Sequence, residues 1–133
     1  MALKIRGTFT VMVTAFDTEG RLDLDAQSRF TDWQVGQGIH GLIPLGSTGE
    51  FLSLSFSERK ALTDCVINTV DGRVPVIIGA GAESTEEVIK NLEMAEESGA
   101  DGTMIIPPFY STPTRAELIR HFERISDKAS KPI

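Results

Sequence analysis

The sequence predicts an α/β fold in which parallel strands alternate with crossover helices, as in a (β/α)8 TIM barrel. Four apolar runs rich in strand-forming residues occur at intervals of about 30 residues, and each is followed by a segment with helical periodicity. Three of these helical segments also begin with a matching start signal. A complete barrel of this type takes about 250 residues. We therefore expect residues 1–133 to supply its N-terminal half, about the first four βα units.

The strands are expected where apolar and β-branched residues gather. These runs are Thr8–Val13, His40–Leu45, Val74–Ile78 and Gly102–Ile106. Their spacing leaves room for one helix between successive strands, which is how parallel neighbours are connected. Lys131-Pro132-Ile133 resembles the lead-in Arg73-Val74-Pro75-Val76, so a fifth strand is expected to begin there.

Three helices are expected to begin at capping boxes, in which a hydroxyl residue is followed three positions later by glutamate. The pairs are Ser55 and Glu58, Ser84 and Glu87, and Thr114 and Glu117. Apolar residues at helical spacing mark the inward faces of these helices. They are Leu62, Val66 and Val70 in the first of the three, Val88, Leu92 and Ala95 in the second, and Leu118, Phe122 and Ile125 in the third.

An earlier helix is expected over roughly Asp25–Gln37, with Phe30 and Trp33 as its inner face. Glycines stand where left-handed helix ends would fall, as they commonly do in such structures. They are Gly38, Gly72 and Gly99.

Composition and charge exclude several classes of protein. With 41% apolar and 24% charged residues, the chain is typical of one globular domain. Its net charge of -6 and its single Trp and Tyr argue against a nucleic-acid partner. No run approaches the roughly 20 apolar residues that a membrane helix needs, and the one cysteine, Cys65, has no partner for a disulfide. We therefore expect a cytoplasmic protein without a membrane partner. His40 and His121 lie far apart, so no metal site is expected.

Candidate functional residues follow the expected strands at their carboxyl ends, where barrels of this type carry their functional groups. Thr14 follows the first run, Ser47 and Thr48 the second, Gly79-Ala80-Gly81 the third and Phe109-Tyr110 the fourth. In a barrel all of these residues would lie on one rim.

The loop Gly46-Ser47-Thr48-Gly49-Glu50 places two hydroxyls between two glycines, directly after an apolar run. Backbone amides and hydroxyl oxygens can converge there on a small carboxylate, because glycine leaves the approach open. A second motif, Pro107-Pro108-Phe109-Tyr110-Ser111-Thr112-Pro113, contains the single tyrosine. On these two motifs, and over essentially the whole chain, the sequence resembles the dihydrodipicolinate synthase and N-acetylneuraminate lyase family of Schiff-base, pyruvate-dependent aldolases.

The resemblance implies a role for each site residue. Thr48 and the backbone amides beside it, Gly49 included, would bind the pyruvate carboxylate. Ser47, also at the substrate, would pass a proton between tyrosines. Tyr110 would reach across a tight dimer interface into the neighbouring subunit's site and complete this relay. Hydroxyls joined by hydrogen bonds can shuttle protons that none of them would transfer efficiently alone. The resemblance also implies a homodimer or a tetramer built from two dimers, and no cofactor.

In this family the nucleophile is a lysine on the sixth strand. None of the five lysines in this sequence follows an expected strand, because they fall on helices or terminal segments. We therefore expect the Schiff-base lysine to lie outside residues 1–133 and the 133-residue chain alone to be inactive.

The implied substrates are pyruvate and an aldehyde such as aspartate semialdehyde, which is the chemistry of lysine biosynthesis. Ser47 stands where these synthases often have threonine, and the loop also resembles those of N-acetylneuraminate lyases and sugar-acid aldolases or dehydratases. Such an enzyme remains an alternative, as does a non-catalytic half-barrel assembly module. Lysine-inhibited synthases have tyrosine at the position of Phe109 and asparagine at that of Glu83, so feedback inhibition by lysine is not expected.

Overall fold

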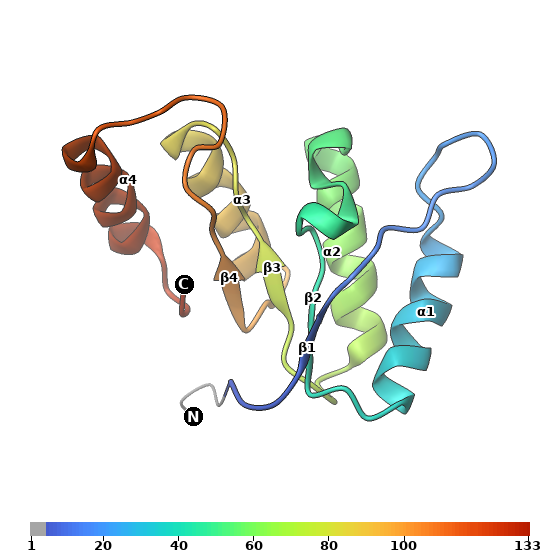
Figure 1. Ribbon diagram of the computed structural model, residues 1–133. Coiled ribbons are helices and arrows are strands. Elements are labelled where there is room, and N and C mark those ends of the chain that lie inside the picture. The colour runs from blue at the N-terminus through green and yellow to red at the C-terminus, as the bar shows by residue number, and fades with distance from the viewer. Residues whose placement is uncertain (1–4) are drawn as a thin grey trace.

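The computed structural model describes residues 5–133 as four parallel strands with four helices along one face. The strands are β1 (Phe9–Val11), β2 (Gly41–Ile43), β3 (Ile77–Gly79) and β4 (Gly102–Met104). In Figure 1 the loops that follow the strands gather at the top of the view. Each strand overlaps its predicted run but is shorter than that run. Pro44 and Pro75 lie just outside β2 and β3, where their lack of an amide hydrogen limits the ladder.

The strands follow one another in space in the order of the sequence. β1 pairs with β2 and β3 pairs with β4, both in parallel. The two pairs are joined by one parallel bridge between Leu42 and Val76. At the outer edge of β4, the Thr103 amide donates to the Pro132 carbonyl at 3.0 Å. Pro132 therefore occupies the side of β4 where the sequence predicts a fifth strand.

The helices are α1 (Leu24–Gly36), α2 (Phe56–Val70), α3 (Thr85–Glu97) and α4 (Arg115–Lys128), and two short 3-10 helices, η1 (Ser47–Gly49) and η2 (Phe51–Ser53), lie between β2 and α2. The capping boxes predicted for α2 and α4 are confirmed, because both reciprocal bonds form at each. At α3, the Ser84 hydroxyl accepts from the Glu87 amide, but within residues 5–133 the Ser84 amide does not donate back to the Glu87 carboxylate, so only half of the predicted box forms. The three predicted left-handed glycines, Gly38, Gly72 and Gly99, all have positive φ.

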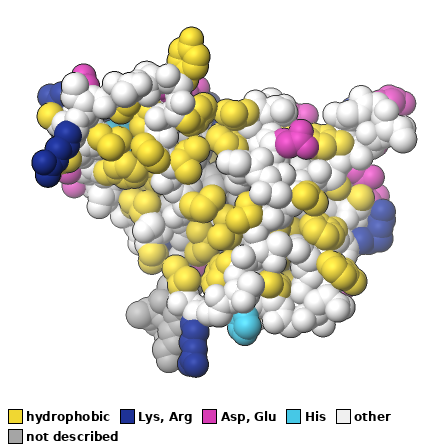
Figure 2. Space-filling model, viewed as in Figure 1, with side chains coloured by type: hydrophobic (Ala, Val, Ile, Leu, Met, Phe, Trp, Pro, Cys, Tyr) yellow, Lys and Arg dark blue, Asp and Glu magenta, His cyan; other side chains and the backbone are white. Residues whose placement is uncertain are grey.

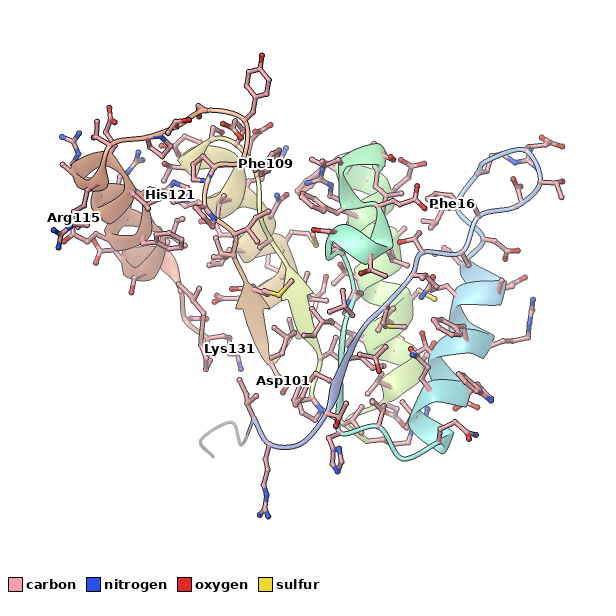
Figure 3. The ribbon with its side chains drawn as sticks, viewed as in Figure 1. Phe16, Asp101, Phe109, Arg115, His121 and Lys131 are labelled. Atoms are coloured by element: carbon pink, nitrogen blue, oxygen red, sulfur yellow. The ribbon has the colours of Figure 1, made fainter. Side chains whose placement is uncertain are left out.

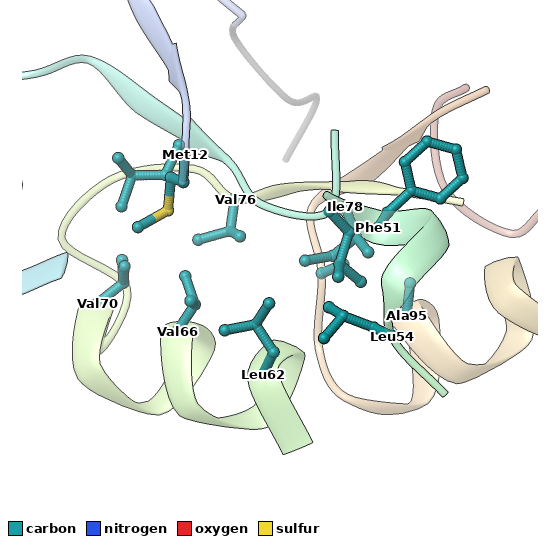
Figure 4. Packing of buried hydrophobic residues seen from close by; sticks show 12 residues of the cluster. Met12, Phe51, Leu54, Leu62, Val66, Val70, Val76, Ile78 and Ala95 are labelled. Atoms are coloured by element: carbon teal, nitrogen blue, oxygen red, sulfur yellow. The ribbon is translucent and has the colours of Figure 1, made fainter. Parts of the chain in front are cut away.

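The main core lies between the strands and α2. Figure 4 shows Leu62, Val66 and Val70 of α2 pointing toward Met12 and Val76 on the strand side. The predicted inner faces of α2 and α3 are confirmed, since all six residues are buried. On α4, Ile125 is buried whereas Leu118 and Phe122 are only half-buried. The opposite face of the strands is open, and Figure 2 shows hydrophobic side chains gathered over it.

The predicted inner face of α1 is wrong in one residue. Phe30 packs against the core, but Trp33 is 57% exposed and stacks on Phe30 from outside. The residues of α1 that are buried are polar: Gln27, Thr31 and Gln34. Gln27 turns inward because its amide group accepts from the Ala15 amide at 2.8 Å and donates to the Val13 carbonyl at 3.3 Å. The helix is thus oriented by hydrogen bonds to the segment after β1 as well as by apolar burial.

Candidate active site

The loop after β2 is shaped by two residues in the left-handed backbone conformation. Leu45 has φ 60° and Glu50 has φ 53°, values that are uncommon outside glycine and mark sharp turns. Between them, Ser47, Thr48 and Gly49 form η1. The first residues of a helical turn have amides without an acceptor inside the helix. The exposed hydroxyls of Ser47 and Thr48 therefore lie beside backbone N–H groups.

Gly49 and Gly79 hold this loop close to its neighbours because a side chain would not fit at either position. A Cβ at Gly79 would lie 2.0 Å from the Leu45 carbonyl oxygen, and one at Gly49 would lie 2.9 Å from the Met12 carbonyl oxygen. The Gly79 amide also donates to the Pro44 carbonyl at 2.9 Å. The carboxyl end of β3 thus lies directly against the turn at Leu45.

Thr14 ties the loop after β1 to η1. Its hydroxyl donates to the Gly49 carbonyl at 2.6 Å, across 35 positions of sequence. Its hydroxyl is therefore occupied by the protein itself. Within residues 5–133, by contrast, the side chains of Ser47 and Thr48 have no hydrogen-bond partner. The two predicted site hydroxyls are free to bind a ligand, and Thr14 supports the loop that presents them.

Phe51, the first residue of η2, lines two hollows. A small one of about 20 Å³ adjoins Ser47 and is lined by residues from the ends of β2, β3 and β4. It has room for about one water molecule. A larger pocket of about 490 Å³ lies on the side of Arg59 and Glu83. Phe51 lines both hollows, and the Arg59 guanidinium lies 5.5 Å from the centre of its ring.

Tyr110 lies on the long loop between β4 and α4. The ring of its neighbour Phe109 meets that of Phe51 edge to face, with centroids 6.2 Å apart, so this loop touches the segment that follows η1. Phe109 is labelled at the top of Figure 3, at the same end as the other strand-following loops. The Tyr110 side chain itself is 92% exposed. Among the described residues, no hydrogen bond joins Tyr110 to Ser47.

Glu83 contacts the loop that carries Tyr110, a contact that no pattern in the sequence predicts. One carboxylate oxygen accepts from the amides of Phe109 and Tyr110, each at 3.0 Å, and the other accepts from the Ser111 amide at 2.7 Å and from the Ser111 hydroxyl. The Ser111 hydroxyl and the three amides lower the pKa of the Glu83 carboxyl to about 2. Glu83 is therefore ionised and saturated with donors at neutral pH.

The lysines that the structure describes lie away from the strand ends. Lys60, Lys90 and Lys128 are on helices and Lys131 follows α4, whereas Lys4 lies outside the described residues. Within residues 5–133, histidines, cysteines and carboxylates form no group of three or more that could hold a metal ion. None of the helices in this part of the chain is long and apolar enough to cross a membrane.

Four parallel βα units, with the exposed hydroxyls of Ser47 and Thr48 on the loop after β2, define the class of the protein. The arrangement is that of part of a (β/α)8 barrel. A sequence profile described as the dihydrodipicolinate synthetase family matches residues 4–133, and the chain belongs to this family.

Individual members of the family show how similar this chain is to known proteins. It is 43% identical over 129 residues to a 4-hydroxy-tetrahydrodipicolinate synthase of Cereibacter sphaeroides, a match that covers 97% of this chain and 44% of the relative. Among solved structures it resembles YagE, a prophage protein of this family from E. coli K12 in complex with pyruvate, with TM-score 0.92, 38% identity and coverage of 96% and 43%. It also resembles a monomeric dihydrodipicolinate synthase variant, with TM-score 0.87, 38% identity and coverage of 96% and 42%. The chain thus spans less than half the length of these relatives.

Proposed function

We propose that residues 1–133 are the N-terminal half of a TIM-barrel catalytic domain whose complete form is a pyruvate-dependent lyase of the 4-hydroxy-tetrahydrodipicolinate synthase type. The observation that carries this proposal is η1, where the hydroxyls of Ser47 and Thr48 are exposed beside backbone amides between two left-handed turns. The names of the relatives support the same reaction class. The substrates proposed are pyruvate and an aldehyde such as aspartate semialdehyde.

In this proposal, each part of η1 has its own task. Thr48 and the backbone amides at the start of η1 bind the pyruvate carboxylate and orient the ketone. The Gly49 amide already donates to the Gly46 carbonyl at 3.0 Å, so Gly49 contributes open space beside the hydroxyls and not the amide donor that the resemblance implies. An amine from a lysine attacks that ketone, and water leaves as the imine forms. The imine then loses a proton from its methyl group to give an enamine, whose carbon attacks the aldehyde carbonyl. Ser47 carries protons during these steps, because a hydroxyl can accept one hydrogen bond while it donates another. Such a lysine needs a lowered pKa in order to be neutral when it attacks.

The first test is imine formation. We expect the complete polypeptide that contains residues 1–133 to be trapped by borohydride on pyruvate, which adds the mass of reduced pyruvate to one lysine. A polypeptide of residues 1–133 alone should show no adduct, because its described lysines are on helices or beyond α4.

Mass spectrometry of peptides locates the adduct. A specific adduct on one of the five lysines of residues 1–133 would disprove the proposed location of the nucleophile. No adduct in the complete, folded polypeptide would disprove the Schiff-base mechanism itself. The trapping experiment thus tests the reaction class. The second substrate is identified separately, by comparing turnover with aspartate semialdehyde and with sugar acids.

The proposed enzyme is a cytoplasmic homodimer or tetramer. Support for self-association comes from Tyr110, which is 92% exposed, and from Phe109 and Leu52, which are also exposed and line one pocket together. A phenol that lies so far outside its own subunit is suitably placed to enter a neighbouring one. The monomeric relative makes the oligomeric state a matter for direct test.

The second test asks whether Tyr110 acts in trans. A complete Tyr110→Phe chain and a complete chain without its Schiff-base lysine should each be nearly inactive. Mixed dimers of the two should regain activity, because one of the two sites then has an intact lysine and an intact tyrosine from the partner. Turnover is measured on heterodimers purified by two different tags. Inactive heterodimers that bind pyruvate normally would show that Tyr110 does not act across the interface.

A further inference from the structure

The loop that carries Tyr110 has little backbone support of its own. Among residues 5–133, backbone carbonyls accept no hydrogen bond from the amides of Phe109, Tyr110 or Ser111. The segment from Pro107 to Pro113 also contains three prolines, which cannot donate. Since the Tyr110 side chain is 92% exposed, packing within the subunit does little to hold it either.

Glu83 is the acceptor for all three of these amides. Its carboxylate receives them at 2.7 to 3.0 Å, together with the Ser111 hydroxyl. Hydrogen bonds to an ionised acceptor are about twice as strong as bonds between neutral groups. Both carboxylate oxygens accept hydrogen bonds from the loop. The Glu83 side chain therefore fixes the direction of three successive backbone N–H groups.

The backbone next to Glu83 is itself held in place by hydrogen bonds. Glu83 lies between β3 and Ser84, the residue that caps α3. The Ala80 amide donates to the Met104 carbonyl at 3.0 Å, and the buried Asn91 donates to the Ala80 carbonyl at 3.4 Å. The segment before Glu83 is thus bonded to both β4 and α3. These bonds fix the position of Glu83, and Glu83 in turn fixes the backbone of the loop.

We infer that Glu83 is a positioning residue for Tyr110, holding the loop backbone so that the phenol projects in one direction from the subunit. This inference rests on the proposed catalytic role of Tyr110. It assigns to Glu83 a function in turnover, although the Glu83 carboxylate touches neither Ser47 nor Thr48.

The hydrogen bonds between the Glu83 carboxylate and the loop are expected to persist in mild acid. A carboxyl whose pKa is lower in the folded protein than its ordinary value of 4.5 stabilises the folded state above pH 4.5 and loses that contribution as the pH falls toward about 2. The order of the loop should therefore be unchanged between neutral pH and about pH 5.

The test uses Glu83→Gln in the complete enzyme, because glutamine keeps the size but replaces one acceptor oxygen with an NH₂ group that opposes the donors of the loop. We expect kcat to fall by about tenfold and the KM for pyruvate to change by less than about twofold, since η1 is untouched. Glu87→Gln is the matched control. Glu87 lines the same pocket, and its carboxylate accepts from Ser84 but not from the loop. It should leave kcat and KM unchanged.

Two further measurements separate positioning from a general loss of stability. Hydrogen exchange of the peptide that contains residues 109–111 should be faster in Glu83→Gln than in the wild type or in Glu87→Gln. In a Tyr110→Phe background, Glu83→Gln should cause no further fall in kcat, because its effect passes through the phenol.

The outcomes are distinct. The same loss of kcat in both backgrounds, or normal kcat despite faster exchange, would overturn the inference for Glu83. Unchanged exchange in Glu83→Gln would overturn it as well, whatever the kinetics. Full turnover by Tyr110→Phe alone would instead refute the proposed role of Tyr110, and the exchange rates would still decide whether Glu83 holds the loop.

Discussion

Replacing Ser47 by alanine in the complete enzyme will lower kcat by roughly 10²-fold or more and change the KM for pyruvate much less. The physical reason is that a proton-relay hydroxyl contributes mainly while protons move. Ser47 has no hydrogen-bond partner among residues 5–133, so its loss leaves no buried protein group unpaired. Steady-state kinetics with varied pyruvate separate the two constants.

Two variants serve as controls for Ser47→Ala. Ser47→Thr keeps the hydroxyl and should be nearly neutral. Thr48→Val should mainly raise the KM for pyruvate, because a group that binds the carboxylate equally in the ground and transition states affects binding alone. Full turnover and normal KM in Ser47→Ala would contradict the relay. If the Ser47 and Thr48 variants instead lost activity only in proportion to lost stability, both hydroxyls would be structural.

Replacing Gly79 by alanine is expected to have the largest effect on stability. The new methyl group would lie 2.0 Å from the Leu45 carbonyl oxygen and 2.5 Å from its carbon, which are backbone atoms that cannot move aside as a side chain can. We expect the free energy of unfolding to fall by about 3 kcal/mol or more, the upper range for overpacking. Urea denaturation of the complete protein, followed by circular dichroism, measures this change.

The matched control is Gly36→Ala. Gly36 is the last residue of α1, and a Cβ there would meet nothing within 4 Å. Alanine is favoured over glycine in helices by up to about 1 kcal/mol, so this variant should be neutral or slightly stabilising. Equal stabilities for the two variants would mean that β3 can move away from the turn at Leu45 at little cost.

Much of the fold could be predicted because its determinants are local. Each observed strand overlaps a predicted apolar run, and the caps at Ser55 and Thr114 form from residues only three positions apart. The helical spacing of Leu62, Val66 and Val70 likewise identified the face of α2 that forms the core. The strands are nevertheless shorter than the runs that predict them.

The errors and omissions come from contacts between distant residues. The sequence predicts Trp33 beside Phe30 on the inner face of α1, but the polar Gln27 is buried there because it satisfies backbone groups of Val13 and Ala15. Glu83 lies 26 to 28 positions from its partners, and nothing in the sequence distinguishes it from a solvent-exposed glutamate. The site roles of Ser47, Thr48, Gly49 and Tyr110 remain predictions.

The order of the strands in space has a consequence for how the protein is made. The main contacts are between elements close in sequence: α1 with α2, β1 with β2, β3 with β4, and α3 with α4. Ribosomes add about 5–20 residues each second, whereas helices and short loops form within microseconds. Each βα unit can therefore meet its partner while the next is still being translated. We expect this half of the barrel to gain its structure progressively from the N-terminus during synthesis, which shortens the time that its apolar strands are exposed to other nascent chains.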